Sequence, residues 1–315
     1  MKICVLGAGA LGSSIGGLLT EAGLEVFLVD TWKEHIAAMI HNGLRLREQG
    51  SERLIKVRAT DDVRTLGAVD LVILLVKSFF TEQAIRSAKS VIGDETIVLS
   101  LQNGLGNEEI IAEAIGKGHV LGGVTHTGAV LLGPGQVLIS RKGKLTYIGE
   151  LDGMKTDRAN EVSRLLSSAG IQTDVTENIY EKIWNKLLVN VAVSPLSAIT
   201  GLPHGGMANV REVVGCAEAA VAEAMTVAGV AGVFLATEDP SQIWRLATEG
   251  LPADHKSSML QDIEKGARTE IDFINGAVVK WGAKYGVPTP VNKTLVAGVK
   301  GIEYRQQNLK TSEPK

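Results

Sequence analysis

The chain has 315 residues, of which 45% are hydrophobic, and its 32 Lys and Arg against 35 Asp and Glu give a formal net charge of -3. This composition is typical of a globular protein with room for two domains, and the scattered basic residues argue against nucleic-acid binding. No apolar run reaches the length of a membrane span, and no charged and then apolar leader precedes the first strand, so we expect a cytoplasmic protein without membrane contacts.

The first predicted element is an apolar strand, Lys2 to Leu6, which leads directly into a glycine-rich turn and a helix. The turn has the Gly-x-Gly-x-x-Gly pattern that binds the pyrophosphate of a dinucleotide at a helix N-terminus. Gly7 allows the tight turn, Gly9 lets a phosphate approach the backbone, and Gly12 lets the helix pack closely on the strand. We therefore predict that cofactor contacts come from Gly7, Ala8, Gly9, Ala10, Leu11 and Gly12.

Further strands and helices alternate along the first half of the chain. A strand at Glu25–Val29 ends in Asp30, a helix follows at Trp32–His41, and the segments Leu44–Arg47 and Arg53–Val57 read as an inserted hairpin. Helices are predicted at Thr81–Val91, Asn107–Ile115 and Asp157–Ala169, and strands at Val120–Thr127 and Gln172–Val175. Three short segments (Ala129–Leu132, Gln136–Ser140 and Leu145–Ile148) predict an antiparallel meander.

Two apolar strands end in polar side chains. The strand Val69–Val76 is followed by Lys77, and the strand Thr96–Leu101 is followed by Gln102 and Asn103. Ligands of open parallel sheets bind at the carboxyl ends of the strands, so both side chains are candidates for the cofactor cleft. The alternatives are a solvated lysine at a strand end and an asparagine that serves only its turn before Gly104.

The second half of the chain is almost continuously helical. Helices are predicted at Asn178–Val193, Val210–Ala228, Ser241–Ala247, Ser258–Lys265, Glu270–Tyr285 and Asn292–Gln306, and the tail from Leu309 to Lys315 is expected to fray. The fold class is therefore α/β, with a Rossmann-type doubly wound sheet and an antiparallel extension at residues 1–177 and an all-helical domain at residues 178–315. Cys4 and Cys216 have no metal-binding spacing, so no metal is expected.

One helix of the second domain carries a polar stripe, defined as Lys186, Asn190 and Ser194, on an otherwise apolar circumference. The stripe is either a narrow solvent-facing edge or the lining of a cleft, because an unpaired buried ammonium group is unfavourable. A lysine in a partly dry cleft has a lowered pKa, which suits a general acid near neutral pH. Polar residues also gather around Ser258 and from Thr269 to Asn275, where a capped helix is the simpler interpretation.

Taken together, these segments resemble the ketopantoate reductase (2-dehydropantoate 2-reductase) family. The resemblance rests on the glycine loop, Val76-Lys77, Leu101-Gln102-Asn103-Gly104, Trp184-Asn185-Lys186-Leu187 with Asn190, Ser194-Pro195-Leu196-Ser197-Ala198, Ser257-Ser258-Met259-Leu260-Gln261-Asp262, and Thr269-Glu270-Ile271-Asp272 with Ile274-Asn275-Gly276. It implies NADPH-dependent reduction of ketopantoate to (R)-pantoate on the route to pantothenate and coenzyme A.

The resemblance also implies a role for individual residues. Lys186 corresponds to the proton donor and Glu270 to the acid that orders cofactor and substrate around it, both catalytic. Lys77 and Asn103 correspond to residues at the nicotinamide side of the cleft. Asn190 and Ser258, with Asn103 and the position of Ser194, correspond to the hydrogen-bonding partners of the substrate. The chemistry needs no metal, because a cationic acid stabilises the developing alkoxide.

Three positions depart from the family pattern. Ser194 and His204 stand where further asparagines are common, and Asp30 stands where a basic residue is common. A carboxylate after the second strand favours the ribose hydroxyl of NADH over the 2′-phosphate of NADPH. The alternative is that Lys33 binds the 2′-phosphate and restores binding of NADPH. NADPH or NADH therefore stays open, with NADH favoured.

Two other functions remain as alternatives. One is an NADH-dependent D-2-hydroxyacid dehydrogenase that acts on another branched or aromatic 2-oxo acid. The other is a redox-sensing protein that binds dinucleotide without catalysis, which would have no use for the lysine of the polar stripe. The apolar helix around Val213–Val230 is compatible with a homodimer.

Overall fold

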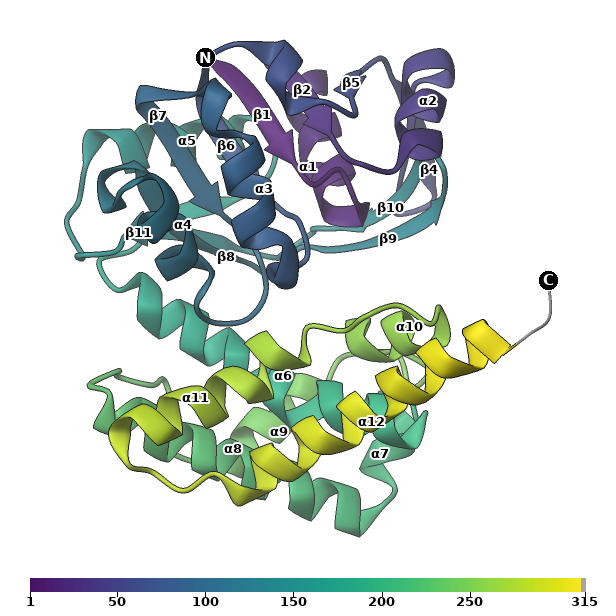
Figure 1. Ribbon diagram of the computed structural model, residues 1–315, viewed down its shortest axis with the longest axis vertical. Helices are drawn as coiled ribbons and strands as arrows, with labels where there is room; N and C mark the ends of the chain where they lie inside the picture. The colour runs from purple at the N-terminus through teal and green to yellow at the C-terminus, as the bar shows by residue number, and fades with distance from the viewer. Residues whose placement is uncertain (313–315) are drawn as a thin grey trace. The chain divides into compact units, whose positions relative to one another are not determined.

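The computed structural model describes residues 1–312, with side chains to residue 308, and divides into two compact units. Unit 1 comprises Met1–Gln102 and Asn107–Tyr180, and unit 2 comprises Asn103–Gly106 and the chain from Glu181 onward. The expected α/β class, with a parallel-sheet domain followed by a helical one, is confirmed (Figure 1). The predicted boundary near Glu177 lies just before Tyr180, the last residue of unit 1, but the assignment of Asn103–Gly106 to unit 2 was not predicted.

Unit 1 is built on an eight-stranded sheet with the order β12-β11-β8-β7-β6-β1-β2-β5. The strands are β1 (Lys2–Leu6), β2 (Glu25–Val29), β5 (Arg58–Thr60), β6 (Val69–Leu74), β7 (Ile92–Ser100), β8 (Val120–Thr125), β11 (Thr146–Glu150) and β12 (Thr173–Val175). The pairs from β5 to β8 are parallel, and β11 joins β8 in the antiparallel direction. The predicted change of direction within the sheet is therefore present.

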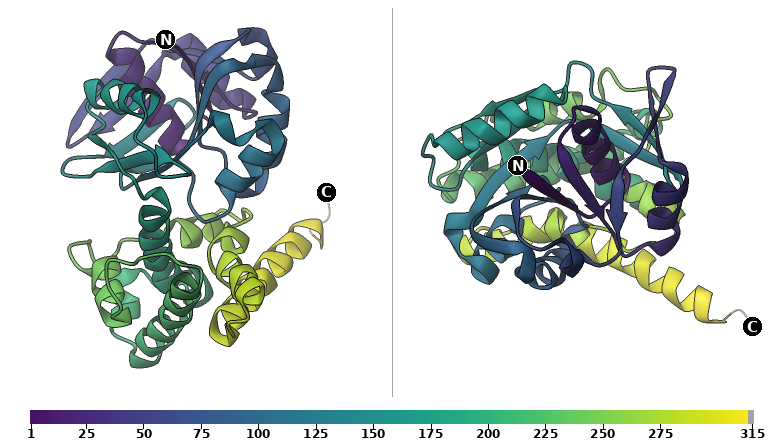
Figure 2. Two further views of the ribbon diagram at one scale, coloured as in Figure 1. Left: turned by 90° about the vertical axis from the view of Figure 1, so that its left-hand side faces the viewer. Right: turned by 90° about the horizontal axis from the view of Figure 1, so that it is seen from above.

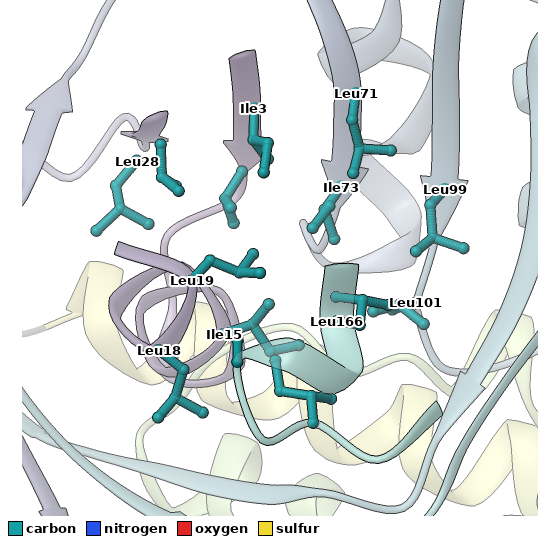
Figure 3. Close-up of a cluster of buried hydrophobic side chains, with 14 of the residues drawn as sticks. Ile3, Ile15, Leu18, Leu19, Leu28, Leu71, Ile73, Leu99, Leu101 and Leu166 are labelled. Atoms are coloured by element: carbon teal, nitrogen blue, oxygen red, sulfur yellow. The ribbon is translucent and has the colours of Figure 1, made fainter. Parts of the chain in front are cut away.

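Helices lie on both faces of this sheet (Figure 1, Figure 2). The helices are α1 (Ala10–Glu21), α3 (Thr81–Ser87), α4 (Asn107–Ile115) and α5 (Asp157–Ser168). Ile3 and Val5 of β1 belong to the cluster that α1 and α5 cover, part of which Figure 3 shows. Cys4 and Leu6 point to the opposite face and belong to the second cluster. Two covered faces explain why the strands are apolar on nearly every residue.

A second sheet of four strands, in the order β4-β3-β10-β9, packs against the other side of α1. Its strands are β3 (Leu44–Glu48), β4 (Ser51–Ile55), β9 (Gly128–Gly133) and β10 (Gln136–Ser140), and α2 (Lys33–Asn42) precedes it. The predicted hairpin is confirmed as the antiparallel pair β3 and β4. The predicted meander is wrong beyond β9 and β10, because β10 pairs with β3 rather than with β11. In this pairing Leu46 and Val137 are both buried in the cluster that packs around α1, so burial favours it.

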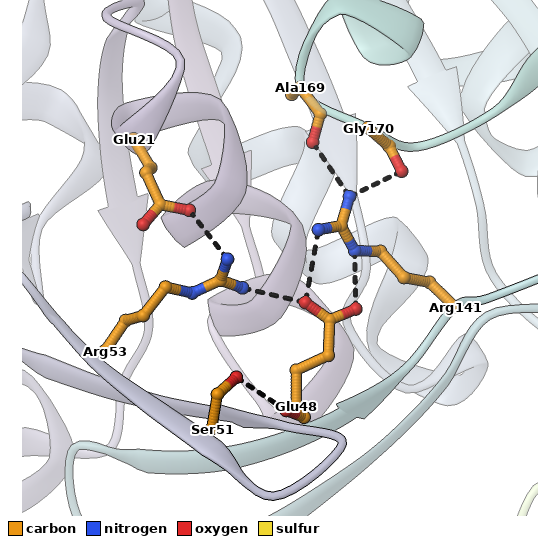
Figure 4. Close-up of polar contacts among 7 residues, drawn as sticks. All are labelled: Glu21, Glu48, Ser51, Arg53, Arg141, Ala169 and Gly170. Atoms are coloured by element: carbon orange, nitrogen blue, oxygen red, sulfur yellow. Dashed lines mark hydrogen bonds and ion pairs between the residues drawn. The ribbon is translucent and has the colours of Figure 1, made fainter.

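A half-buried ion-pair network holds the second sheet to the turn between α5 and β12 (Figure 4). Arg141 donates from Nε to Glu48 Oε1 at 2.8 Å and from Nη1 to the carbonyl oxygens of Ala169 and Gly170 at 3.2 and 2.6 Å. Arg53 Nη2 donates to Glu48 Oε2 at 2.8 Å. The hydrogen bonds from Arg141 keep the pKa of the Glu48 carboxyl below its usual range.

Unit 2 consists of helices, as predicted. They are α6 (Ile179–Thr200, which begins in unit 1), α7 (His204–Ala208), α8 (Arg211–Val230), α9 (Pro240–Thr248), α10 (Ser258–Glu264), the 3-10 helix η5 (Ile271–Phe273), α11 (Asn275–Tyr285) and α12 (Pro290–Ser312). α6 continues through Pro195 instead of ending at Val193, and α7 was not predicted. α12 extends beyond Gln306 to Ser312, and the rest of the tail that was expected to fray lies outside the described residues.

The predicted helix Glu270–Tyr285 is two elements in the structure. η5 covers Ile271–Phe273, and α11 begins only at Asn275. The break lies at Ile274, whose φ of -105° and ψ of -95° are not helical. Glu270 is therefore the residue that precedes a short 3-10 turn and is not part of a long helix.

The expectation that no apolar segment is long enough to span a membrane is wrong for one helix, α8. By length and composition alone, α8 could cross a membrane, although only 33% of its most apolar window is buried in the protein. Its buried residues, such as Val221 and Val227, face neighbouring helices, and α8 packs against α9, α11 and α12. Glu223 accepts from the N–H groups of Val291 and Asn292 at 2.8 and 3.0 Å, so α8 caps the start of α12. These contacts are those of a helix that packs within unit 2.

Candidate active site

Two glycines of the glycine-rich turn are required by packing. Gly7 has φ +100°, where other residues are strained, and a Cβ on it would overlap the backbone of Val76. A Cβ on Gly12 would overlap the carbonyl of Gly7, so helix α1 lies as close to the turn as its backbone allows. The N–H groups of Gly7 and Ala8 both donate to the Val29 carbonyl at 2.9 and 3.0 Å, which ties the turn to β2.

Gly9 is different, because a Cβ there would meet nothing within 4 Å. Its φ of -64° is available to any residue, and no side chain caps the start of α1 at this position. Neither packing nor backbone conformation therefore requires a glycine at this residue. Open space beside an uncapped helix N-terminus fits the pyrophosphate of a dinucleotide. Unit 1 thus has the cradle that NADH or NADPH needs.

A hydrogen-bonded network behind the turn fixes Ala8. Ser13 Oγ donates to the Ala8 carbonyl at 2.7 Å and lies 2.9 Å from His35 Nε2. Gly135 N donates to His35 Nδ1 at 2.9 Å, so Nε2 carries the ring hydrogen and donates to Ser13. Burial lowers the pKa of His35, which keeps the ring neutral. The turn between β9 and β10 therefore supports the glycine-rich turn, and no spacing in the sequence links these residues.

Asp30 lies directly after β2, where the predicted ribose contact should be. Its Oδ1 accepts from the Trp32 N–H at 2.9 Å. Lys33, the nearest cation in sequence, has an exposed side chain whose Nζ lies 3.9 Å from Asp61 Oδ2. The cation that could offset Asp30 is therefore beside a second carboxylate.

The two strand-end candidates belong to different units. Lys77 is half-buried and directly precedes the 3-10 turn Ser78–Phe80 in unit 1. Asn103 is half-buried and begins the loop Asn103–Gly106 of unit 2. Within this loop Gly104 has φ +91°, and Leu105 N donates to the Phe273 carbonyl at 2.9 Å. The loop is therefore fixed to η5, next to Glu270, and it does more than turn the chain.

The polar stripe of α6 is partly dry. Lys186 and Asn190 are half-buried and Ser194 is buried, while Trp184, Leu187 and Leu188 on the rest of the helix are fully buried. Burial lowers the pKa of Lys186 to about 8, and the charge of Glu270 acts in the opposite direction. This favours the cleft interpretation of the stripe over a solvated edge.

The residues around Glu270 hold it in place. Glu270 is buried, and its carbonyl accepts from the N–H groups of Phe273 and Ile274 at 2.9 and 3.1 Å. Thr269 donates from both its backbone N and its Oγ1 to Glu303 Oε1 at 2.7 Å. A buried carboxylate beside a half-buried lysine, both on fixed backbone, is an arrangement suited to proton transfer.

Two further predicted positions lie at helix starts. Ser258 is the exposed first residue of α10, and the buried Ser257 before it caps the helix by accepting from Leu260 N at 3.1 Å. His204 is buried, its ring packs edge-on to His255 at 4.9 Å, and neither ring nitrogen has a hydrogen-bond partner among the described residues. Burial lowers the pKa of His204.

In residues 1–312, no cluster of three or more His, Cys, Asp or Glu could hold a metal ion.

Comparison with known proteins decides the family. The model described as "Ketopantoate reductase PanE/ApbA" matches residues 3–153, and its C-terminal counterpart matches residues 178–303. The chain belongs to the ketopantoate reductase family. A 2-dehydropantoate 2-reductase of Pyrococcus horikoshii is 39% identical over 305 residues, which cover 96% of this chain and 98% of that protein.

Solved structures of similar proteins agree with this membership. A ketopantoate reductase of Ralstonia eutropha has a TM-score of 0.89 at 34% identity and covers 98% of this chain and 100% of its own. A D-mandelate dehydrogenase, solved with NADH and anilino(oxo)acetate, has a TM-score of 0.91 at 31% identity and covers 98% of this chain and 100% of its own. The fold of this ketopantoate reductase family member is thus shared by proteins named ketopantoate reductase and D-mandelate dehydrogenase.

Proposed function

We propose that this family member reduces the 2-oxo acid ketopantoate to (R)-pantoate in pantothenate and coenzyme A biosynthesis. The observation that carries the proposal is the ammonium group of Lys186, half-buried on α6 beside Glu270 with a pKa lowered to about 8. A 2-oxo acid reductase needs a proton donor of this kind near neutral pH, whereas a protein that only binds dinucleotide does not. The similarity to 2-dehydropantoate 2-reductases supports ketopantoate as the substrate.

Lys186 acts as the general acid of the proposed reaction. When bound, the nicotinamide dinucleotide supplies the hydride that reduces the carbonyl carbon. Lys186 Nζ transfers its proton to the carbonyl oxygen, and solvent then returns a proton to the amine. At neutral pH a group with a pKa of about 8 is mostly protonated and still gives up its proton readily.

Glu270 and four polar residues orient the substrate in this proposal. The carboxylate of Glu270 keeps Lys186 charged against the effect of burial. Asn103, Asn190, Ser194 and Ser258 serve as the hydrogen-bonding partners of the 2-oxo acid, since amides and hydroxyls can match both its carboxylate and its hydroxyl groups. Lys77 serves on the nicotinamide side.

We propose NADH as the preferred cofactor. Asp30 and Asp61 place two carboxylates around the end of β2, and Lys33 lies 3.9 Å from Asp61. A carboxylate after this strand accepts hydrogen bonds from the ribose hydroxyls of NADH and repels the 2′-phosphate of NADPH.

The deciding experiment is the oxidation of NADH and NADPH by the purified protein with ketopantoate. Lys186→Ala should lower kcat by about 10²–10⁴-fold, the range for losing a general acid. Lys182→Ala is the matched control, because Lys182 lies one turn earlier on α6 and pairs with Glu181. Dinucleotide binding without turnover of any 2-oxo acid by the wild type would leave a binding protein as the function.

A second candidate is an NADH-dependent reductase of another branched or aromatic 2-oxo acid to its D-2-hydroxy acid. The similarity to a D-mandelate dehydrogenase and the buried His204 favour it. Turnover of ketopantoate should be compared with that of 2-oxoisovalerate and phenylpyruvate, in the wild type and in His204→Asn. A higher kcat/KM for either of the latter substrates would replace ketopantoate.

We further propose that the protein acts in the cytoplasm as a homodimer, without nucleic-acid or membrane partners. Helix α8 exposes a face of small residues, Gly215, Ala219, Ala222 and Gly229, that a second copy could approach closely. Light scattering after gel filtration measures the mass directly, and Ala222→Glu should give monomers if this face forms the contact.

A further inference from the structure

A buried polar network links the ends of β6 and β7 in unit 1. Gln102 Nε2 donates to the Val76 carbonyl at 2.8 Å and to Thr81 Oγ1 at 2.7 Å. Thr81 Oγ1 donates to Asn107 Oδ1 at 2.9 Å. Gln102 and Asn107 flank the loop Asn103–Gly106 in sequence, so the network holds both ends of the loop that carries Asn103.

The direction of each hydrogen bond in this network is fixed. The Val76 carbonyl can only accept, so Gln102 must turn its amide nitrogen toward it and its Oε1 toward Ser100. Ser100 Oγ donates to this Oε1 at 3.3 Å and thereby uses its single hydrogen. Ser100 therefore has only lone pairs left for its other neighbour, the carboxyl group of Glu108.

Glu108 is an unusual neighbour for such a serine. It lies in the first turn of α4 and is 2% exposed, and its Oε2 has no hydrogen-bond partner among the described residues. The titratable groups that face it are Glu109 of the same helix and Tyr180 of α6, whose hydroxyl donates to Glu109 Oε1 at 3.2 Å. Both are acids and give no charge compensation to a Glu108 carboxylate.

We propose that Glu108 is a positioning residue that must be protonated: it donates its hydrogen to Ser100 and so completes the network that holds the Asn103–Gly106 loop. Ionisation of Glu108 leaves a carboxylate that competes with Gln102 for the hydrogen of Ser100, and Gln102 then loses a partner. Burial raises the pKa of Glu108 to about 7, so this change takes place near neutral pH. The importance of the loop for catalysis rests on the proposed function.

Amide hydrogen exchange of the loop tests the proposal without any substrate. The reporter is the N–H of Leu105, which donates to the Phe273 carbonyl. After correction for intrinsic exchange, wild-type protection of residues 103–106 should fall at least ~3-fold between pH 6 and pH 8.5, as expected for a local opening coupled to one ionisation. In Glu108→Gln, whose amide can donate to Ser100 at every pH, protection should stay constant.

Two variants separate positioning from general stability. Glu113→Gln changes an exposed carboxylate on the same helix and should behave like the wild type. Glu108→Ala should reduce protection of the loop at both pH values, and a loss confined to residues 103–106 distinguishes it from global unfolding. Equal protection of the wild type and Glu108→Gln at both pH values would overturn the proposal.

Turnover provides a second reading that depends on the proposed function. The kcat/KM for ketopantoate should be measured in Glu108→Gln and in the wild type at pH 6 and pH 8.5. The value of the variant divided by that of the wild type should rise at least ~3-fold between these two pH values. A flat ratio with a pH-dependent loop would overturn the catalytic part of the proposal. If the wild type does not reduce ketopantoate, the proposed function fails, whereas hydrogen exchange still decides the role of Glu108.

Discussion

The charge of Glu270 opposes the effect of burial on Lys186, and the pKa of the lysine is about 8 as the net result. A general acid works in its protonated form, so reduction should be fast below this pKa and slow above it. Lys186 lies on α6, and Glu270 directly precedes η5, so the two residues come from separate segments of the chain. Their relationship therefore gives a pH dependence with a defined direction.

We expect kcat/KM for reduction to fall as pH rises through about 8. In Glu270→Gln the opposing charge is lost, so the pKa of Lys186 should drop and the fall should begin at a lower pH. The profiles are best measured in a Glu108→Gln background, where the proposed ionisation of Glu108 cannot contribute to the pH dependence. Glu264→Gln, which breaks the exposed pair with Lys256, is the control. A Glu270→Gln profile that coincides with the control would contradict the assigned coupling.

Substitution of the glycines should separate cofactor binding from packing. Gly9→Ala meets no atom within 4 Å, so the free energy of unfolding should change by less than ~0.5 kcal/mol. The added methyl group occupies the phosphate space, and the Kd for dinucleotide should rise at least ~10-fold, which is ~1.4 kcal/mol. Gly12→Ala should instead destabilise the protein by ~1–3 kcal/mol through overpacking. Calorimetric titration and urea unfolding measure the two effects, and unchanged affinity in Gly9→Ala would exclude this binding site.

Asp30 should determine which dinucleotide is preferred. Asp30→Ser keeps an acceptor for the Trp32 N–H but removes the negative charge. We expect the preference for NADH over NADPH, measured as the ratio of kcat/KM values, to fall at least ~10-fold, because one lost charged contact contributes ~1.4 kcal/mol or more. Asp94→Ser, at an exposed position of unit 1, should leave the ratio unchanged. A wild type that prefers NADPH would contradict the prediction at the outset.

The network around Glu48 should contribute to stability in a pH-dependent way. Arg141→Met removes two hydrogen bonds to the Glu48 carboxylate and should lower the free energy of unfolding at pH 7 by ~1.5–3 kcal/mol. The pKa of Glu48 is lowered in the folded protein, so its contribution is complete above its usual pKa of 4.5 and is lost as pH falls below it. Urea unfolding of the wild type and Arg141→Met at pH 7 and pH 4 measures this loss, and the difference in free energy of unfolding should be smaller at pH 4.

The matched control for Arg141 is Arg86→Met. Arg86 forms an exposed pair with Glu82 one turn away on α3. Exposed pairs of this kind contribute ~0–1 kcal/mol, so stability should hardly change at either pH. An Arg141→Met variant as stable as this control at pH 7 would show that the network is dispensable.

Local patterns in the sequence were sufficient for the parts of the fold with strong periodicity. The glycine-rich turn, the buried strands β6 and β7 and the polar stripe on α6 were all placed on the correct kind of element. Their signals are local, because a covered strand is apolar on each residue and a helix repeats its faces every three to four residues. The family resemblance then added roles for Lys186 and Glu270, and these roles stay predictions.

Features that depend on contacts between distant residues were not predicted. The pairing of β10 with β3, the bond from His35 to Ser13 and the ion pair of Glu48 with Arg141 join segments far apart in the chain. Glu108 was also missed, since a glutamate in the first turn of a helix is ordinarily a favourable surface residue. Its side chain is buried by contacts with residues distant in the sequence, so the sequence around Glu108 does not predict this burial.

The loop Asn103–Gly106 belongs to unit 2 but lies within the sequence of unit 1, so the two units cannot be separated by a single cut in the chain. A gene fragment that begins at Ile179 would encode every helix of unit 2 but not this loop. The Phe273 carbonyl would then lose the Leu105 N–H, and the space against Phe273 that Gly104 fills would be empty. The two units are therefore not interchangeable modules: a chimera that exchanges the C-terminal half must carry the matching four-residue loop inside its N-terminal half.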